Sequence, residues 1–112
     1  MKDINAEAEK TLSRLERRVC YYYPESFNDF PIVSFYNLAE RPEFSADNRE
    51  DIQNGTVAVD IWSDRKRECG DVSLEVNEVM TADGWVREFS RDIPPEGGVY
   101  HKTMRFSKSF LV

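Results

Sequence analysis

Hydrophobic residues recur with two different periods along this chain, and the change from one period to the other limits the folds that it can adopt. From Asp3 to Cys20 they recur at helical spacing, and charged residues fill most of the other positions. In several later segments the period falls to two residues, which is typical of strands with one face on a core. The sequence therefore predicts a domain that combines helices with a sheet.

The same criterion assigns the rest of the chain. After the first helix, which Pro24 prevents from continuing, we expect strands at 31–38 and 56–63, a helix from Asp71 to Gly84, and strands at 85–93 and 99–110. Gly84 is expected to end the second helix in the left-handed conformation. This order predicts an α+β fold, with a mostly antiparallel sheet of about four strands and both helices packed on one side.

A long polar stretch, Glu43–Gly55, separates the first two expected strands. Its sequence, EFSADNREDIQNG, is rich in turn-forming residues. Compact domains usually join neighbouring strands with about two to five residues, and connections beyond roughly a dozen tend to be functional or disordered. We therefore interpret this stretch as a long loop, of the length that tends to be functional or disordered.

Length and charge narrow the class of protein. The chain has 112 residues, with 21 acidic and 15 basic residues and a formal net charge of -6. One domain spanning 1–112 is expected, and an excess of acidic residues disfavours nucleic-acid binding, which requires clustered positive charge. The polar start and the lack of a long apolar run indicate a cytoplasmic protein without a membrane segment, in which Cys20 and Cys69 are reduced.

No motif marks a catalytic, cofactor or metal site. The stretch from Asp47 superficially resembles a calcium loop, but Arg49 and Ile52 stand where that loop needs Asp or Asn and then Gly. His101 is the only histidine, and its place on the polar face of a strand predicts an exposed side chain. The basic run 65–68 is expected to be a solvated turn.

Aromatic residues at the ends of the expected elements are a further candidate for binding. Nucleic-acid platforms couple such rings to positive charge, whereas the net charge of this chain is negative and the rings fall at element ends. We therefore expect these rings to pack in the core or to anchor an interface. They are Tyr21, Tyr22, Tyr23, Trp62 and Trp85.

The element order and several strand phrases resemble a family of bacteriophage proteins. The amphipathic first helix is followed by PIVSFYNLAERPEF at 31–44, VAVDIWSD at 57–64, VSLEVNEVMTADG at 72–84 and YHKTMRFS at 100–107. Together they are similar to the tail terminator family of long-tailed phages, also called tail completion or minor tail protein U-type. The resemblance covers most of the chain and includes no catalytic signature.

The resemblance implies an assembly role without catalysis. Family members are α+β subunits that close into a ring, typically a hexamer, on the end of the tail tube. The implied partners are copies of the chain itself, the major tail tube protein and a head-completion protein, with DNA passing through the ring without specific binding. Assembly would occur in the cytoplasm of the bacterial host, and the final location would be the virion tail.

A closed ring requires two different complementary surfaces on each subunit. Under this interpretation the central polar stretch supplies contacts to the tube or to a neighbouring subunit. The charged residues expected to make those contacts are Arg41, Glu43, Asp47, Arg49, Glu50 and Asp51.

Two other interpretations remain open at this point. The chain could be a head-closure or connector component of the phage neck, which would also form a ring. It could instead be a small bacterial adaptor or antitoxin-like module that binds one protein partner. An enzyme is disfavoured, since it would require a deep pocket that gathers His101 and several carboxylates.

Overall fold

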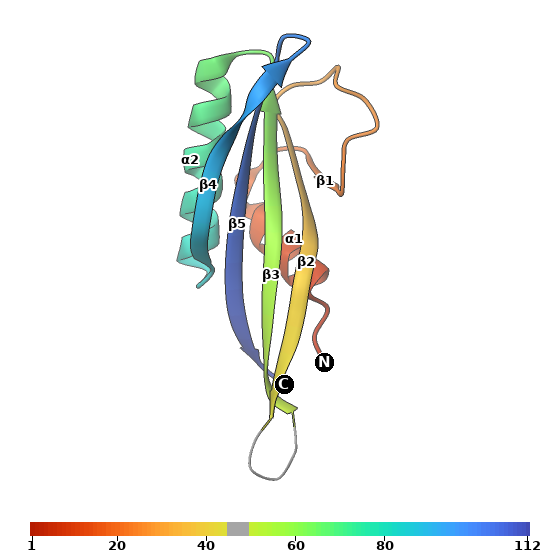
Figure 1. The fold of residues 1–112 in the computed structure, drawn as a ribbon, viewed down its shortest axis with the longest axis vertical. Coiled ribbons are helices and arrows are strands. Elements are labelled where there is room, and N and C mark those ends of the chain that lie inside the picture. The colour runs from red at the N-terminus through yellow and green to blue at the C-terminus, as the bar shows by residue number, and fades with distance from the viewer. Residues whose placement is uncertain (45–49) are drawn as a thin grey trace.

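The computed structural model describes residues 1–44 and 50–112 as one sheet with helices packed against it (Figure 1). The five-stranded sheet has the strand order β1-β2-β3-β5-β4. In chain order the elements are α1 (Ile4–Leu12), the short 3-10 helix η1 (Ser13–Leu15), β1 (Val19–Tyr21), β2 (Ile32–Phe44), β3 (Glu50–Ser63), α2 (Lys66–Ala82), β4 (Val86–Glu96) and β5 (Val99–Leu111).

The α+β class and the mostly antiparallel sheet are confirmed, but the strand number differs from the expectation. β1 lies parallel to β2, and every other neighbouring pair of strands is antiparallel. β1 was missed because the helical spacing of apolar residues continues to Val19. In the structure Glu16 adopts a left-handed conformation with φ 56°, which ends the helical segment, and Val19 begins a strand.

α1 is held at its start and along one face. The Asp3 carboxylate accepts a hydrogen bond from the backbone N–H of Ala6 at 3.1 Å, which caps the helix. Ile4, Ala8 and Leu12 form its buried stripe. The helix therefore docks through apolar side chains, as its sequence pattern predicts.

α2 begins at Lys66, before the predicted start at Asp71, so most of the run 65–68 that was expected to be a solvated turn is helix. The Ser63 hydroxyl accepts a hydrogen bond from the Arg65 N–H at 3.0 Å and donates one to Glu68 at 2.8 Å, so it organises the first turn from outside the helix. The predicted end is confirmed. Gly84 has φ 91° and donates its N–H to the Thr81 carbonyl in a Schellman motif.

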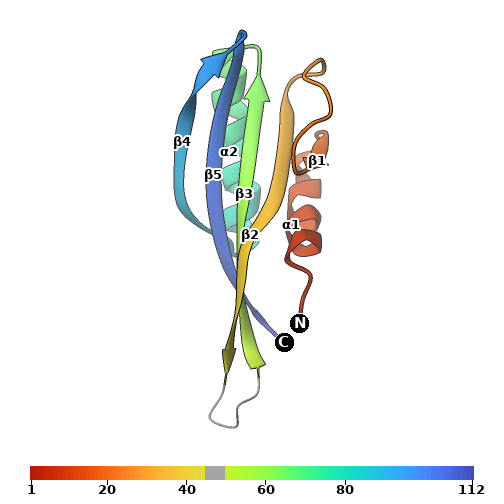
Figure 2. The same cartoon turned by 45° about the vertical axis from the view of Figure 1, so that its right-hand side comes forward.

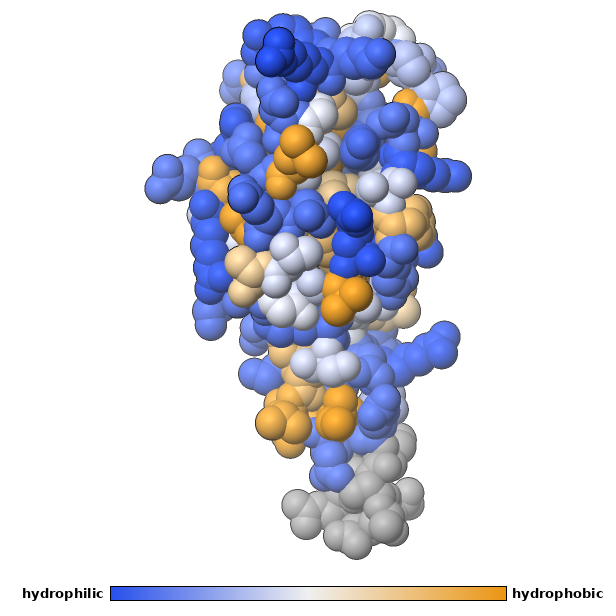
Figure 3. Space-filling view, turned by 90° about the vertical axis from the view of Figure 1, so that its left-hand side faces the viewer, coloured by the Kyte–Doolittle hydropathy of each residue, from blue (hydrophilic) through white to orange (hydrophobic). Residues whose placement is uncertain are grey.

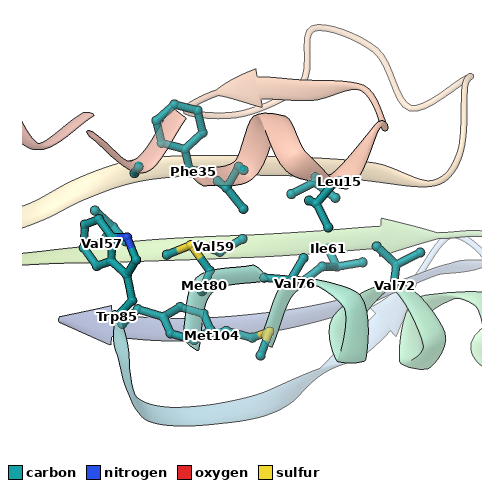
Figure 4. Packing of buried hydrophobic residues seen from close by; sticks show 14 of the residues in the cluster. Leu15, Phe35, Val57, Val59, Ile61, Val72, Val76, Met80, Trp85 and Met104 are labelled. Carbon is teal, nitrogen blue, oxygen red and sulfur yellow. The ribbon is translucent and has the colours of Figure 1, made fainter. Parts of the chain in front are cut away.

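The hydrophobic core lies between the helices and one face of the sheet. Figure 1 shows both helices behind the sheet, and Figure 2 shows the same layers from the side. Figure 4 shows alternate residues of β3 pointing toward the helices. Its labelled core residues are Leu15, Phe35, Val57, Val59, Ile61, Val72, Val76, Met80, Trp85 and Met104, all buried.

β4 and β5 form a tight hairpin at one end of the molecule. Glu96 pairs with Val99, and the two residues between them, Gly97 and Gly98, have φ of 60° and 78°. Two consecutive positive φ angles are those of a type I′ turn, whose twist matches the strands and which favours glycine. Among the described residues, neither helix is long and apolar enough to cross a lipid bilayer.

Candidate functional site

The central polar stretch is mostly a β-hairpin, which corrects the expectation of a long loop. β2 continues to Phe44 and β3 starts at Glu50, with Arg41 opposite Asn54 and Glu43 opposite Ile52. We call the paired segments 39–44 and 50–55 the arm. Figures 1 and 2 show that the arm extends along the long axis of the molecule, beyond the helices.

Both chain ends brace the arm. The backbone N–H of Lys2 donates to the Gln53 side-chain oxygen at 2.7 Å, and the Gln53 amide donates back to the Lys2 carbonyl at 3.0 Å. Gln53 is only 2% exposed and also donates to Glu40. On the C-terminal side, the N–H of Val112 donates to the Asp51 carbonyl at 3.1 Å. These contacts, together with the pairing of β5 along residues 52–55, fix the arm to the domain.

The charged residues predicted at this stretch follow the strands of the arm. Arg41, Glu43 and Asp51 are exposed, and Glu43 accepts a hydrogen bond from Asn54 at 3.0 Å. Glu50 is the first residue of β3. Asp47 and Arg49 lie outside the described residues. The arm thus presents charge to solvent without gathering it into a site for chemistry.

Two sheet edges lack a strand partner among the described residues, and they differ from each other. β1 pairs only with 33–35, so the following part of β2 is bonded only to β3. At the opposite edge β4 pairs only with β5, and every residue of β4 except Ile93 is exposed. Figure 3 views the molecule from the β4 side and shows separate hydrophobic patches on a mainly hydrophilic surface. A strand exposed on both faces offers both backbone and side chains to a partner.

Aromatic rings gather on the sheet face that the helices leave uncovered. We call them the aromatic cluster; its members are Tyr22, Tyr23, Phe27, Tyr36, Trp62 and His101. Tyr22 stacks on Tyr36 with ring centroids 5.3 Å apart. The Tyr23 ring lies between the rings of Tyr36 and Trp62, and its centroid is 6.2 Å and 6.0 Å from theirs. The cluster therefore joins the segment after β1 to the central strands, and this arrangement fits the interface or packing role expected of the tyrosines and of Trp62.

His101 is half-buried, so the expectation that it would be exposed is wrong. Its ring stacks on Trp62 with centroids 4.4 Å apart, and its Nε2–H donates to the Asp60 carboxylate at 2.8 Å. Asp60 is 4% exposed. Burial raises the pKa of the neighbouring Tyr36 hydroxyl, and Tyr23 and the Asp60 carboxylate raise this pKa further. Polar groups on this face are thus enclosed by rings and not by a helix.

A pocket of about 270 Å³ opens beside this cluster, at the end of the sheet opposite the arm. We call it the terminal pocket. Its walls include Phe27, Trp62, Ile93, Pro94, Glu96 and His101. It combines aromatic and aliphatic surface with one exposed carboxylate and the His101 ring, a composition that suits binding.

The other candidate residues have structural roles. Arg65 and Glu68 form an ion pair at the start of α2 instead of a solvated turn. Cys20 and Cys69 are free thiols. Burial raises the pKa of the Cys69 thiol, and its Sγ donates to the Ile61 carbonyl at 3.7 Å. A buried thiol with a raised pKa is a poor nucleophile.

The terminal pocket was not found from the sequence, although two signals pointed toward it. Asp60 is a charged residue in an otherwise apolar strand phrase, and the run of tyrosines before Pro24 is unusually aromatic. Neither signal says which residues of β4 and β5 complete the pocket, since that depends on strand register. The sequence matches no model of a known protein family, and no curated protein matches it.

Proposed function

We propose that this chain is a subunit of a ring that caps the tail tube of a long-tailed bacteriophage, ends tube polymerisation and forms the joint with the head. The observation that carries the proposal is the pair of unlike sheet edges, the β2 side of the arm and the exposed β4 strand. A ring needs a heterologous interface, in which one surface of each subunit meets a different surface of the next. The two edges supply such a pair of surfaces.

The shape of the subunit supports a role in assembly. The molecule measures 54 × 23 × 22 Å, and the arm forms one end of its long axis. Hydrogen bonds from Lys2 to Gln53 and from Val112 to Asp51 hold the arm in place, which lowers the entropy lost when it contacts another protein. A braced projection is suited to reach across to a tube or to a neighbouring subunit.

The assignment to phage tails, among ring-forming proteins, rests on the resemblance in element order. The helix, paired strands, second helix and closing strand pair follow the order described for the tail terminator family. The excess of acidic residues is consistent with a channel that DNA crosses without binding, since like charges repel. Under this proposal the partners are further copies, the tube protein and a head-completion protein.

The first experiment is the solution mass over a wide concentration range, measured by light scattering and native mass spectrometry. The proposal expects a species near six times the 13.1 kDa of one chain, either free or after addition of tail tubes. A chain that stays monomeric or dimeric and leaves tube ends uncapped would contradict it and favour a single-partner adaptor. A ring that binds portal complexes and ignores tubes would point to a head-closure component.

A matched pair of variants tests which edge closes the ring. Val86 on β4 and Leu74 on α2 are both exposed apolar residues, at 63% and 69%. Val86→Lys places a charge on the edge strand and should lower the ring fraction at least about tenfold, because an unpaired buried charge costs more than about 1.4 kcal/mol. Leu74→Lys should leave the ring intact. If the two variants behave alike, β4 is not the interface.

A further inference from the structure

The terminal pocket lies far from the arm, and its walls are held in place by contacts inside the domain. Figure 1 shows the β4–β5 turn and the arm at opposite ends of the sheet. Trp62 is 5% exposed, with the His101 ring stacked against it at 4.4 Å. Phe27 meets Trp62 edge-on at 5.7 Å and is itself 44% exposed. The aromatic wall is therefore preorganised, and part of it is open to solvent.

One carboxylate, that of Glu96, belongs to the residues that line the pocket. Glu96 is exposed, and no ion pair joins it to any residue in the described part of the chain. The Asp60 carboxylate lies behind His101. Among the residues that the structure describes, no lysine or arginine lines the pocket. An unpaired carboxylate beside aromatic rings attracts a cation through both its charge and the negative faces of the rings.

The size of the pocket indicates what kind of cation fits. At about 270 Å³ it lies below the roughly 300–1,000 Å³ of sites that enclose whole small molecules. A single long side chain is a better match. Its aliphatic stem can lie on Ile93 and Pro94 while its charged end reaches Glu96 and the rings.

Arginine suits these walls better than lysine. Its planar guanidinium stacks on aromatic faces and donates two parallel hydrogen bonds to one carboxylate, whereas an ammonium is a compact and strongly hydrated charge. We propose that the terminal pocket binds an arginine side chain of a partner protein. This assignment does not depend on ring formation, because all the residues involved belong to one chain.

The probe is N-acetyl-arginine amide, titrated into the full-length protein and followed by ¹H–¹⁵N NMR. Saturable binding with a Kd on the order of 1 mM is expected for so small a ligand. The indole N–H of Trp62 should shift. The indole N–H of Trp85 should not shift, because this side chain lies on the helix-covered side of the sheet and its N–H donates to the Thr11 hydroxyl. The matched neutral probe is N-acetyl-citrulline amide, which has nearly the same shape without the charge and should bind at least about tenfold more weakly.

Two variants make the test specific. Glu96→Gln should weaken binding of the arginine probe about tenfold, while Glu88→Gln, at an exposed carboxylate elsewhere on β4, should leave it unchanged. The proposal is overturned if citrulline binds as well as arginine, if Glu96→Gln has no effect, or if the shifts spread over the acidic surface without saturating. It is equally overturned if a proline-rich peptide, and not the arginine probe, occupies the pocket.

Discussion

On the central strand β3, the two faces are buried to almost the same degree by different means. On β3, Val57, Val59 and Ile61 are fully buried under the helices. Their alternating neighbours Ala58, Asp60 and Trp62 are 4–5% exposed on the face that no helix covers. The helix-covered face is sealed by close-packed apolar side chains, whereas the other face is sealed by rings, a histidine and a carboxylate. Burial alone therefore does not distinguish the two faces of this strand, whereas the chemistry of the groups that cover them does.

The largest expected effect is the loss of packing on the helix-covered face. Ile61→Ala should lower the free energy of unfolding by about 2–5 kcal/mol, because it opens a cavity between the sheet and α2. A domain of this size has a total stability of about 5–15 kcal/mol, so the change should be plain in urea denaturation. Thr103→Ala on the opposite face should cost less than about 1 kcal/mol. Equal costs at the two sites would break the distinction between the faces.

A smaller effect is expected where Ile4 of α1 packs against Gly55 of β3. A Cβ added at Gly55 would lie 2.8 Å from two carbons of Ile4, which is 1% exposed and has little room to move. Gly55→Ala should therefore destabilise the protein by about 1–3 kcal/mol. Gly70 in α2 is the matched control, because a Cβ there meets nothing within 4 Å.

Gly70→Ala should have the opposite sign. It removes a flexible residue from a helix and should stabilise the protein by about 0.5–1 kcal/mol. Thermal and urea unfolding of both variants check the pair. If Gly55→Ala left the free energy of unfolding unchanged, the distance between α1 and the sheet would be larger than the structure indicates.

Acid should weaken the contact between α1 and the end of α2. The Thr11 hydroxyl donates to the Asp83 carboxylate, and this hydrogen bond, with Lys108 and Arg14 nearby, lowers the Asp83 pKa. A carboxyl group whose pKa is lower in the folded state than its unfolded value near 3.9 stabilises the protein above that value. This contribution is lost as the pH falls through the lower, folded-state pKa.

Asp83→Asn should reduce the loss of stability that occurs below about pH 4. The measurement is the urea midpoint of unfolding at pH values between 7 and 2. Some acid dependence should remain, because the pKa of Glu68 is also lowered, mainly by its hydrogen bond from Ser63. Asp92→Asn, at a carboxylate that is 81% exposed, is the control and should keep the full slope. An unchanged slope in Asp83→Asn would remove this carboxylate from the acid response.

The sequence predicted those parts of the fold in which one face of an element is buried. Apolar residues recur along one face of α1 and alternate along β3 and β5. The end of α2 is marked separately, by Gly84. The arm leaves no such pattern, because most of its residues are polar on both faces, and the resulting sequence is the same as that of a loop. The first turn of α2 was missed for a similar reason: Lys66 and Arg67 are exposed, and the capping side chain of Ser63 lies outside the helix.

The candidate surfaces were only partly predictable. Of the charged residues predicted to contact a partner, Arg41, Glu43 and Asp51 lie on paired strands and not in the long loop that was predicted. The terminal pocket depends on the register that puts His101 beside Trp62 and Ile93 beside His101. Register is set by the whole sheet, and a shift of one residue reverses every side chain, so a local pattern could not reveal it.

The smallest expected effect tests how much the uncovered face contributes to folding. The Arg105 guanidinium lies over the Phe89 ring, 4.6 Å from its centroid, and Phe89 is 38% exposed. A cation–π contact at such a site contributes about 0.5–1 kcal/mol. A double-mutant cycle with Phe89→Ala and Arg105→Gln should give a coupling energy in that range, and the cycle of Phe89→Ala with Lys102→Gln should give none. A coupling above about 2 kcal/mol would mean that this face stabilises the fold as the helix-covered face does. A value within the range would leave the residues of the uncovered face free to be selected for binding, because changing them costs little stability.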